Sequence, residues 1–215
     1  MPKTYACAAA SACLLLSACA SVPSSAELDK LTAAIIKVSF RDEGLVKVDR
    51  LTQDDANREC SAADVAGKPI DETLRAGIEA ANMKAIKWPS DGKFIGDWRE
   101  GEKIAQSGRG LTWTDDASQA NGGNCYNCHQ IDQKEISYGT IGPSLHNYGK
   151  LRGVTDPDSA TAKPIVEYTW GKIWNAKAYN ACSNMPRAGH AGILNEVQVR
   201  HVVGLLLDPK SPVNQ

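Results

Sequence analysis

Cys125-Tyr126-Asn127-Cys128-His129 is the stretch of sequence that decides how the rest of the chain is interpreted. It is one copy of the pattern C-x-x-C-H, in which two thiols and an imidazole fall within a single turn of chain. Each thiol can add to one vinyl group of the same porphyrin, and the adjacent imidazole then becomes the fifth ligand of the iron. The pattern predicts a covalently attached haem c, bound through Cys125 and Cys128, with His129 as an axial ligand.

Two other chemistries use closely spaced cysteines, namely a zinc half-site and a redox dithiol. A zinc site needs a second pair of ligands with similar spacing, and the chain has no other C-x-x-C or H-x-x-x-H pattern. A thioredoxin-like dithiol is expected close to a βαβ pattern, which the sequence does not show. The sequence therefore favours haem attachment over both alternatives.

The first residues of the chain predict export from the cytoplasm. Lys3 precedes an apolar stretch from Ala6 to Leu16, which is the order found in a secretory signal. Leu16-Ser17-Ala18-Cys19 resembles a bacterial lipobox, which predicts a signal over residues 1–19 and lipidation of Cys19. Ala18-Cys19-Ala20 also fits an ordinary cleavage site before Ser21. Both interpretations predict a periplasmic protein, and lipidation would tether it to the membrane without a transmembrane helix.

The charge balance excludes two classes of partner. The formal net charge of the 215-residue chain is −1 at pH 7, and charges of both signs are mixed along it. There is thus no electrostatic basis for binding nucleic acid or an acidic membrane surface. After the N-terminus the longest apolar run, Val202 to Leu207, is too short to span a bilayer.

The cysteines that remain form a possible pair. Of the seven cysteines, three lie in the signal region and two are assigned to haem, which leaves Cys60 and Cys182. An even remainder in an oxidising compartment predicts a disulfide between them. Such a bridge would tie the N-terminal part of the chain to the segment before Met185, whereas two separate buried thiols remain the alternative.

Helical spacing of apolar residues predicts an all-α fold. The N-terminal signal accounts for residues 1–19, and a mostly helical extension is expected over residues 20–89. The C-x-x-C-H motif indicates a class I cytochrome c-like haem domain over residues 90–215. In small cytochromes of this kind the first and last helices of the domain cross beside the haem, and Gly101 and Gly204 are suited to that close approach. Mostly loop is expected between those two helices. The predicted helices are Glu27–Phe40, a short helix from Thr52 to Cys60, Asp71–Ile86, Gly96–Gln106, and a last helix that begins at Asn195 with Gln198 as its capping-box partner and ends before Pro209.

The iron of a haem needs a second axial ligand, and Met185 is the candidate that the sequence favours. It lies in the loop Ser183-Asn184-Met185-Pro186 ahead of the last helix, where a cytochrome with His/Met ligation carries its methionine. A lone methionine is otherwise common as core packing. The competing candidates are His190, close enough for a small loop shift to bring it in; His146, expected to face solvent; His201, expected on the polar face of the last helix; and Met83 in the extension.

The turn Ile141-Gly142-Pro143-Ser144-Leu145 is expected to orient the proximal histidine. Proline stiffens the turn and removes a backbone donor. Its carbonyl is expected to accept the Nδ1–H of His129, which would set the orientation of the ring. An ordinary turn is the alternative. Five aromatic residues could wall the haem or simply form core, namely Trp113, Tyr148, Trp170, Trp174 and Tyr179.

Four stretches of the haem domain resemble one family, SoxX, the monohaem subunit of the SoxAX cytochrome of bacterial sulfur oxidation. The resemblance covers about residues 90 to 213, and it departs from the family at Ala188, where a bulky aromatic residue is expected. The stretches are Gly96-Asp-Trp-Arg-Glu-Gly-Glu-Lys103, Gly139-Thr-Ile-Gly-Pro-Ser-Leu145 with Tyr148-Gly-Lys-Leu-Arg-Gly153, Tyr179-Asn-Ala-Cys-Ser-Asn-Met-Pro-Arg187 with Gly189-His190, and Leu205-Leu-Leu-Asp-Pro-Lys-Ser-Pro212.

The resemblance implies a redox subunit rather than the site of sulfur chemistry. In this family SoxX forms a heterodimer with SoxA, which carries the catalytic haem, and together they join thiosulfate to a cysteine of the SoxYZ carrier, an L-cysteine S-thiosulfotransferase reaction. Carried over to this chain, Cys125 and Cys128 would hold the haem, while His129 and Met185 would be axial ligands. Electrons would pass on to a downstream cytochrome c or oxidase.

Two other functions compete with this one. A free-standing, lipid-tethered cytochrome c electron carrier would show the same C-x-x-C-H motif, and only a stable partner would distinguish it. A peroxidase-like enzyme would need Met185 to leave the iron, and it would then bind cyanide or carbon monoxide rapidly in its resting state.

Overall fold

The computed structural model describes residues 23–215, so the predicted signal over residues 1–19 and the lipobox cysteine Cys19 lie outside the described residues. The described residues divide into two compact units, with the boundary after Arg41. In the first unit, helix α1 spans Ser25–Ser39. Ser24 and Glu27 form a capping box at its start, which satisfies backbone donors that would otherwise lack partners. The predicted helix over 27–40 is confirmed.

The second unit is built from helices and loops, and the described part of the chain contains no strand beyond an isolated bridge between Glu43 and Val46. The predicted all-α class is therefore confirmed for the described residues. The α-helices of this unit are α2 Asp55–Val65, α3 Glu72–Lys84, α4 Trp98–Gln106, α5 Tyr148–Leu151, α6 Lys163–Trp174 and α7 Glu196–Leu207, and the short 3-10 helices are η1 Val48–Leu51, η2 Cys125–Asn127, η3 Ala176–Ala178 and η4 Pro212–Asn214.

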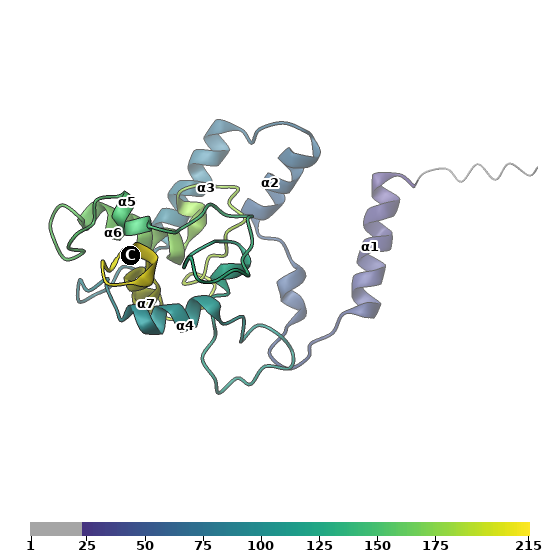
Figure 1. Ribbon diagram of the computed structural model, residues 1–215. Helices are drawn as coiled ribbons and strands as arrows, with labels where there is room; N and C mark the ends of the chain where they lie inside the picture. The colour runs from purple at the N-terminus through teal and green to yellow at the C-terminus, as the bar shows by residue number, and fades with distance from the viewer. Residues whose placement is uncertain (1–22) are drawn as a thin grey trace, which may run out of the picture. The chain divides into compact units, whose positions relative to one another are not determined.

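Helices α4 and α7 pack closely against each other in the second unit (Figure 1). A Cβ atom at Gly101 would overlap the carbonyl of His201, and one at Gly204 would overlap the carbonyl of Gly96. Only hydrogen fits at either position, so the predicted close approach is confirmed. Gly96 N–H also donates to the Arg200 carbonyl (2.9 Å). Asn195 and Gln198 form the predicted capping box at the start of α7.

His201, predicted on the polar face of α7, makes a contact with another helix that the prediction did not include. The side chain is half-buried at the crossing, and its Nδ1 accepts a hydrogen bond from the backbone N–H of Asp97 (2.9 Å). Asp97 is the residue that caps α4. The start of one helix therefore packs on the side of the other, which a single-helix pattern does not predict.

Helix α6 is the main element that the sequence pattern did not identify, because mostly loop was expected between α4 and α7. It packs against α7 and contributes Trp170, which is fully buried, stacks on Trp174 and meets Phe94 edge-on. Its residues include tryptophans, a glycine and β-branched side chains, which have modest helix propensity. Burial on several sides also removes the apolar and polar alternation that marks a surface helix. Packing, rather than local preference, therefore stabilises this helix.

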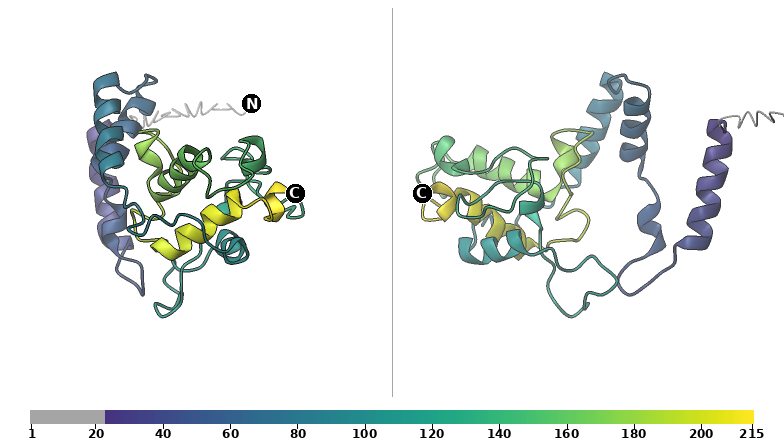
Figure 2. Two further views of the ribbon diagram at one scale, coloured as in Figure 1. Left: turned by 90° about the vertical axis from the view of Figure 1, so that its left-hand side faces the viewer. Right: turned by 45° about the vertical axis from the view of Figure 1, so that its right-hand side comes forward.

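Helices α2 and α3 form a hairpin at the N-terminal end of the second unit (Figure 2). Asp54, rather than Thr52 as predicted, caps α2, which runs to Val65 and so extends beyond the predicted end at Cys60. Asp71 caps α3. The boundary between the compact units falls after Arg41, within the predicted extension over residues 20–89. Residues 42–89 belong to the same unit as the predicted haem domain, and α3 packs against η3.

Candidate functional site

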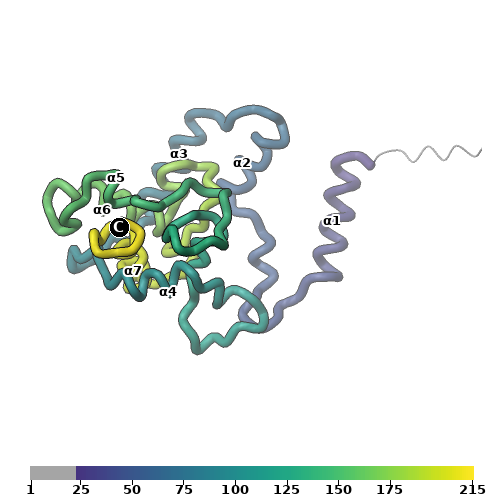
Figure 3. Tube along the Cα trace, viewed as in Figure 1, coloured from purple at the N-terminus to yellow at the C-terminus, as the bar shows by residue number. Residues whose placement is uncertain are grey.

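Cys125 and Cys128 lie on a single tight turn within the long irregular segment between α4 and α5, which Figure 3 follows along the chain. The Cys125 carbonyl accepts hydrogen bonds from the backbone N–H groups of Cys128 (3.1 Å) and His129 (3.0 Å). Asn124, just before the turn, has a left-handed conformation with φ of 50°, which asparagine tolerates better than most residues. Both thiols are free, so the turn presents two half-buried sulfurs followed directly by an imidazole.

The His129 ring is held from one side by the turn at Pro143. Its Nδ1 lies 2.7 Å from the Pro143 carbonyl oxygen, and since a carbonyl can only accept, Nδ1 carries the proton. Gly142 lies close to the ring, because a Cβ there would overlap its Cε1, Nδ1 and Nε2 atoms. Nε2 forms no hydrogen bond within residues 23–215. The nitrogen that would bind a metal is thus available, and the other one is fixed.

Met185 lies in the loop between η3 and α7, half-buried against the hydrophobic core. Its backbone N–H donates to Ser183 Oγ (3.2 Å). Cys125 packs at the edge of the same core. The structure therefore places the predicted thioether and one of the predicted attachment thiols on one hydrophobic cluster.

The other candidates for the second iron ligand lie in positions that favour ligation less than that of Met185, and one of them lies in different surroundings from those predicted. The Nδ1 of His201 is already occupied by Asp97, and His190 is exposed beside Trp174. Met83 lies on α3 and is 37% exposed. His146 was expected to face solvent, but it is half-buried; its Nδ1 is buried without a partner among the described residues, and its Nε2 lies 3.0 Å from Asn147 Nδ2.

Cys60 and Cys182 form a disulfide, with 5.4 Å between their Cα atoms and 122 residues between them in sequence. The alternative of two separate thiols is thereby excluded. The bridge joins α2 to the loop that carries Met185. It therefore connects the region before the predicted haem domain to one of the candidate ligands.

A buried polar pair next to the cysteines was not predicted. The Tyr126 hydroxyl donates to Glu102 of α4 (2.8 Å) and accepts from the Asp132 N–H (3.1 Å). Burial raises the pKa of the Glu102 carboxyl, whose second oxygen is buried without a partner among the described residues. No sequence signal pointed to this pair, since Tyr126 occupies a position at which the C-x-x-C-H pattern specifies nothing.

Burial also raises the pKa of Cys125 to about 12, so this thiol is protonated at neutral pH. The active cysteines of disulfide oxidoreductases have lowered pKa values instead. Within residues 23–215 no three His, Cys, Asp or Glu side chains are placed together as a set of metal ligands. The alternatives of a reactive dithiol and a zinc site therefore gain no support from the geometry.

The residues present fit a covalently bound haem c. Two free thiols share one turn, an imidazole has one nitrogen fixed and the other open, and a thioether lies on the same core. Among the described residues the indole N–H of Trp174 is also buried without an acceptor. A buried donor of this kind normally has a partner, and the polar groups of a bound cofactor would supply one. Trp113, by contrast, is 60% exposed and walls no buried site.

Comparison with known proteins adds one relative. The chain matches no known protein-family profile. It is similar to an uncharacterized lipoprotein of Aquifex aeolicus (strain VF5), with 39% identity over 147 residues. The alignment covers 65% of this chain and 65% of the relative's length. In the part of the chain that the structure describes, no helix is both long and apolar enough to cross a membrane.

Proposed function

We propose that this protein is a c-type cytochrome that transfers electrons through one covalently bound haem c. The observation that carries the proposal is the His129 ring, whose Nδ1 is held by the Pro143 carbonyl at 2.7 Å while Nε2 stays open. Metal-binding histidines are typically oriented by such a bond on the second nitrogen. The free thiols of Cys125 and Cys128, in the turn just before it, are the attachment points.

The assigned residues support electron transfer rather than substrate chemistry. When bound, the haem supplies one-electron oxidation and reduction. His129 and Met185 would both hold the iron in this assignment, so no position would be left open for a substrate. As an iron ligand, the Met185 thioether would favour the reduced iron and raise the reduction potential relative to ligation by two histidines.

We further propose that the protein works as the SoxX-like subunit of a SoxAX complex. Support comes from the family-like segments around Pro143, Met185 and the last helix. The SoxA-like partner would perform the L-cysteine S-thiosulfotransferase chemistry on a SoxYZ-like carrier. This chain would accept the electrons and pass them to a downstream cytochrome c or oxidase.

A tethered electron carrier is the second candidate, and the lipoprotein relative favours it. The lipobox at Leu16–Cys19 supports the same placement, with a lipid on Cys19 holding a periplasmic domain at the membrane. Intact-mass measurement of the mature protein tests the anchor. A mass that begins at an unmodified Ser21 would refute lipidation.

Co-expression with a SoxA-like subunit separates the two candidates. We expect the two chains to co-purify, and we expect this haem to become reduced only when thiosulfate, the partner and the carrier protein are all present. Failure to form a complex, with reduction by generic electron donors alone, would refute the SoxX assignment and leave the tethered carrier. A chain that carries no covalent haem after export would refute both.

A further inference from the structure

The loop that carries Met185, residues 179–190, contains no helix or strand and lies between η3 and α7. We call it the Met185 loop. A segment without regular structure has no internal hydrogen-bond ladder to hold its shape, so contacts with the rest of the molecule must set the position of Met185.

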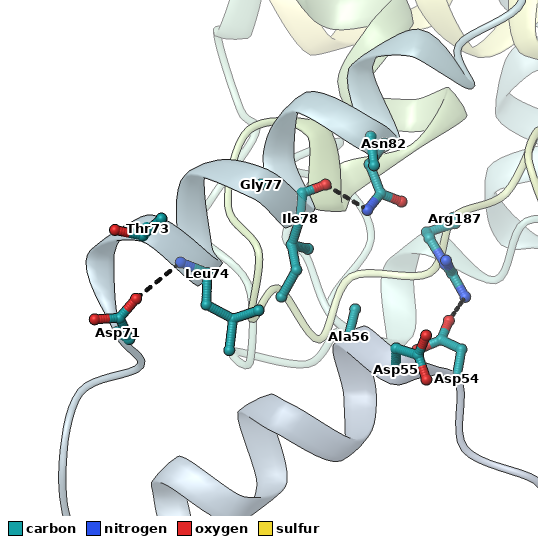
Figure 4. A pocket seen from close by; sticks show the side chains of 11 residues that line it. Asp54, Asp55, Ala56, Asp71, Thr73, Leu74, Gly77, Ile78, Asn82 and Arg187 are labelled. Atoms are coloured by element: carbon teal, nitrogen blue, oxygen red, sulfur yellow. Dashed lines mark hydrogen bonds and ion pairs between the residues drawn. The ribbon is translucent and has the colours of Figure 1, made fainter.

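Helix α2 holds this loop on both sides of Met185. Three residues before it, Cys182 is bonded to Cys60 of α2. Two residues after it, the guanidinium of Arg187 forms an ion pair and hydrogen bond with Asp54, the residue that caps α2 (Figure 4). The Asp54 carboxylate binds Arg187 and caps α2 at the same time, because its other oxygen accepts the helix-capping hydrogen bond from the Asn57 N–H (2.8 Å).

Helix α3 supports the same segment from the other arm of the hairpin. Glu79 accepts a hydrogen bond from the backbone N–H of Ala181 (3.2 Å), and Arg75 holds the Glu79 carboxylate in place (3.0 Å). Near the C-terminal end of α3, the Asn82 side-chain oxygen accepts a hydrogen bond from Nδ2 of Asn175 (2.9 Å), which lies just before η3.

A buried lysine also binds the Met185 loop. Lys177 is only 4% exposed, and its Nζ donates to the carbonyl of Ala181 (2.9 Å). Ala181 therefore has its N–H bonded to α3 and its carbonyl bonded to η3. The next residue, Cys182, forms the disulfide. Two consecutive residues shortly before Met185 are therefore bonded to other parts of the unit.

From these contacts we infer that the α2–α3 hairpin positions Met185 as an iron ligand by clamping the loop on both sides. The inference rests on the proposed haem function and assigns a role to the α2–α3 hairpin, which lies outside the resembling region. Cys60, Cys182, Asp54 and Arg187 are positioning residues in this role. A neutral thioether on a mobile loop would have to be ordered each time it bound, whereas a clamped loop has lost that freedom on folding.

The test compares variants of the full haem-loaded protein in the oxidised state. The double variant Cys60→Ser with Cys182→Ser removes the covalent tie. Asp54→Asn removes the charge that pairs with Arg187 but keeps a good helix cap, since asparagine caps as well as aspartate. The matched control is Arg58→Gln, which removes an ion pair with Asp55 that lies entirely within α2.

Two readouts report on Met185 directly: the sulfur-to-iron charge-transfer band, and the rate at which added imidazole displaces the methionine. We expect the double variant to bind imidazole roughly 10-fold to 100-fold faster, which is the usual scale for loss of groups that support a metal ligand. Asp54→Asn is expected to bind it a few-fold faster, and Arg58→Gln at the native rate. If the double variant does not accumulate in folded form, the comparison of Asp54→Asn with Arg58→Gln decides.

The possible outcomes separate failure of the clamp from failure of the proposed function. A native protein with covalent haem but no charge-transfer band would overturn the Met185 assignment, and the clamp with it, while leaving a c-type cytochrome. A native band together with unchanged imidazole rates in both clamp variants would overturn the clamp alone. A rise in rate for the control equal to that for Asp54→Asn would also overturn it, because the effect would then follow from weakening α2 in general.

Discussion

The two candidate iron ligands are held in opposite ways. His129 is set by residues close to it in sequence, since its ring bonds to Pro143 only 14 positions later and rests on Gly142. Met185 is set by residues far away, through a disulfide that spans 122 positions and an ion pair between Arg187 and Asp54 that spans 133. One side of the site is local, and the other depends on the whole second unit.

This difference has a consequence for how the site fails. Local contacts form with little loss of chain entropy, whereas contacts across long loops must offset a larger loop-closure cost. We therefore expect damage to the N-terminal hairpin to release the methionine while the histidine stays bound. Substitutions in the segment 125–143, which contains the cysteine turn and Pro143, should instead disturb haem attachment.

The largest effect is expected from the cysteines, which divide between the two sides. Replacing Cys125 and Cys128 together with alanine should abolish covalent haem, because both thioether bonds are lost. Replacing Cys60 and Cys182 together should leave covalent haem in place. Haem staining of denaturing gels and intact-mass measurement check both results. Covalent haem in the first variant would show that Cys125 and Cys128 are not the attachment points.

The second-largest effect is expected from the methionines, which test whether the Met185 loop supplies an iron ligand. Met185→Ala should abolish the sulfur-to-iron charge-transfer band and lower the reduction potential, because methionine ligation favours reduced iron. Met83→Ala is the matched control, as this methionine lies on α3 and is 37% exposed. Spectra and redox titration of the two variants should differ clearly. A loss of the band in Met83→Ala instead would assign the ligand to the hairpin.

A glycine on the local side should show a moderate loss of stability. In Gly142→Ala the added Cβ would overlap the His129 ring, and such overpacking typically costs about 1–3 kcal/mol. Thermal unfolding of the haem-loaded protein should show a Tm lower by roughly 2–4 °C for each of these kcal/mol.

The control for that variant is Gly77→Ala on α3, where nothing lies within 4 Å of the added Cβ. Alanine is expected to stabilise this helical position by roughly 0.5–1 kcal/mol, because glycine loses more backbone freedom on folding. Equal Tm values for the two variants would show that Gly142 does not constrain the histidine.

The smallest effect concerns the pH dependence of the Asp54–Arg187 pair. Burial alone would raise the pKa of Asp54, but the Asn57 N–H and Arg187, with Lys177 nearby, together hold it below its usual range. A lowered carboxyl pKa stabilises the protein above the unfolded value of about 3.9, and the stabilisation is lost as the pH falls through the folded value.

Urea unfolding of the native protein and of Asp54→Asn measures this contribution. At neutral pH the native protein should be more stable by about 1 kcal/mol or less, because the pair is partly exposed. The difference should shrink as the pH falls below about 3.9 and vanish once the pH lies below the lowered pKa of the folded protein, where the native carboxyl is also neutral. A difference that persists unchanged in acid would show that the charge of Asp54 does not act on the loop.

The structure also shows where patterns in the sequence reached their limit. The capping box at Asn195 and the glycines of the α4–α7 crossing were predicted correctly, because each is a short-range or steric signal. Helix α6 was missed because its residues gain their helical state from burial around Trp170 rather than from propensity. The starting point of α2 was misplaced at Thr52 because Asp54, two residues later, provides the actual cap.

Two histidines illustrate the same limit at the level of side chains. His201 was expected on a polar face, yet it bonds to Asp97 across the helix crossing. His146 was expected in solvent, yet its Nδ1 is buried. Their surroundings come from elements more than one turn away, and no local pattern encodes those neighbours.

The sequence by itself determined the cysteine turn, the histidine that follows it and the proline carbonyl that orients it, because these groups lie within one short stretch whose geometry the backbone imposes. It also narrowed the disulfide to Cys60 and Cys182 by counting. Only the tertiary structure decided that this disulfide and the Asp54–Arg187 pair hold the Met185 loop from both sides. Contacts between residues more than a hundred positions apart depend on how helices pack, and packing is a property of the assembled chain.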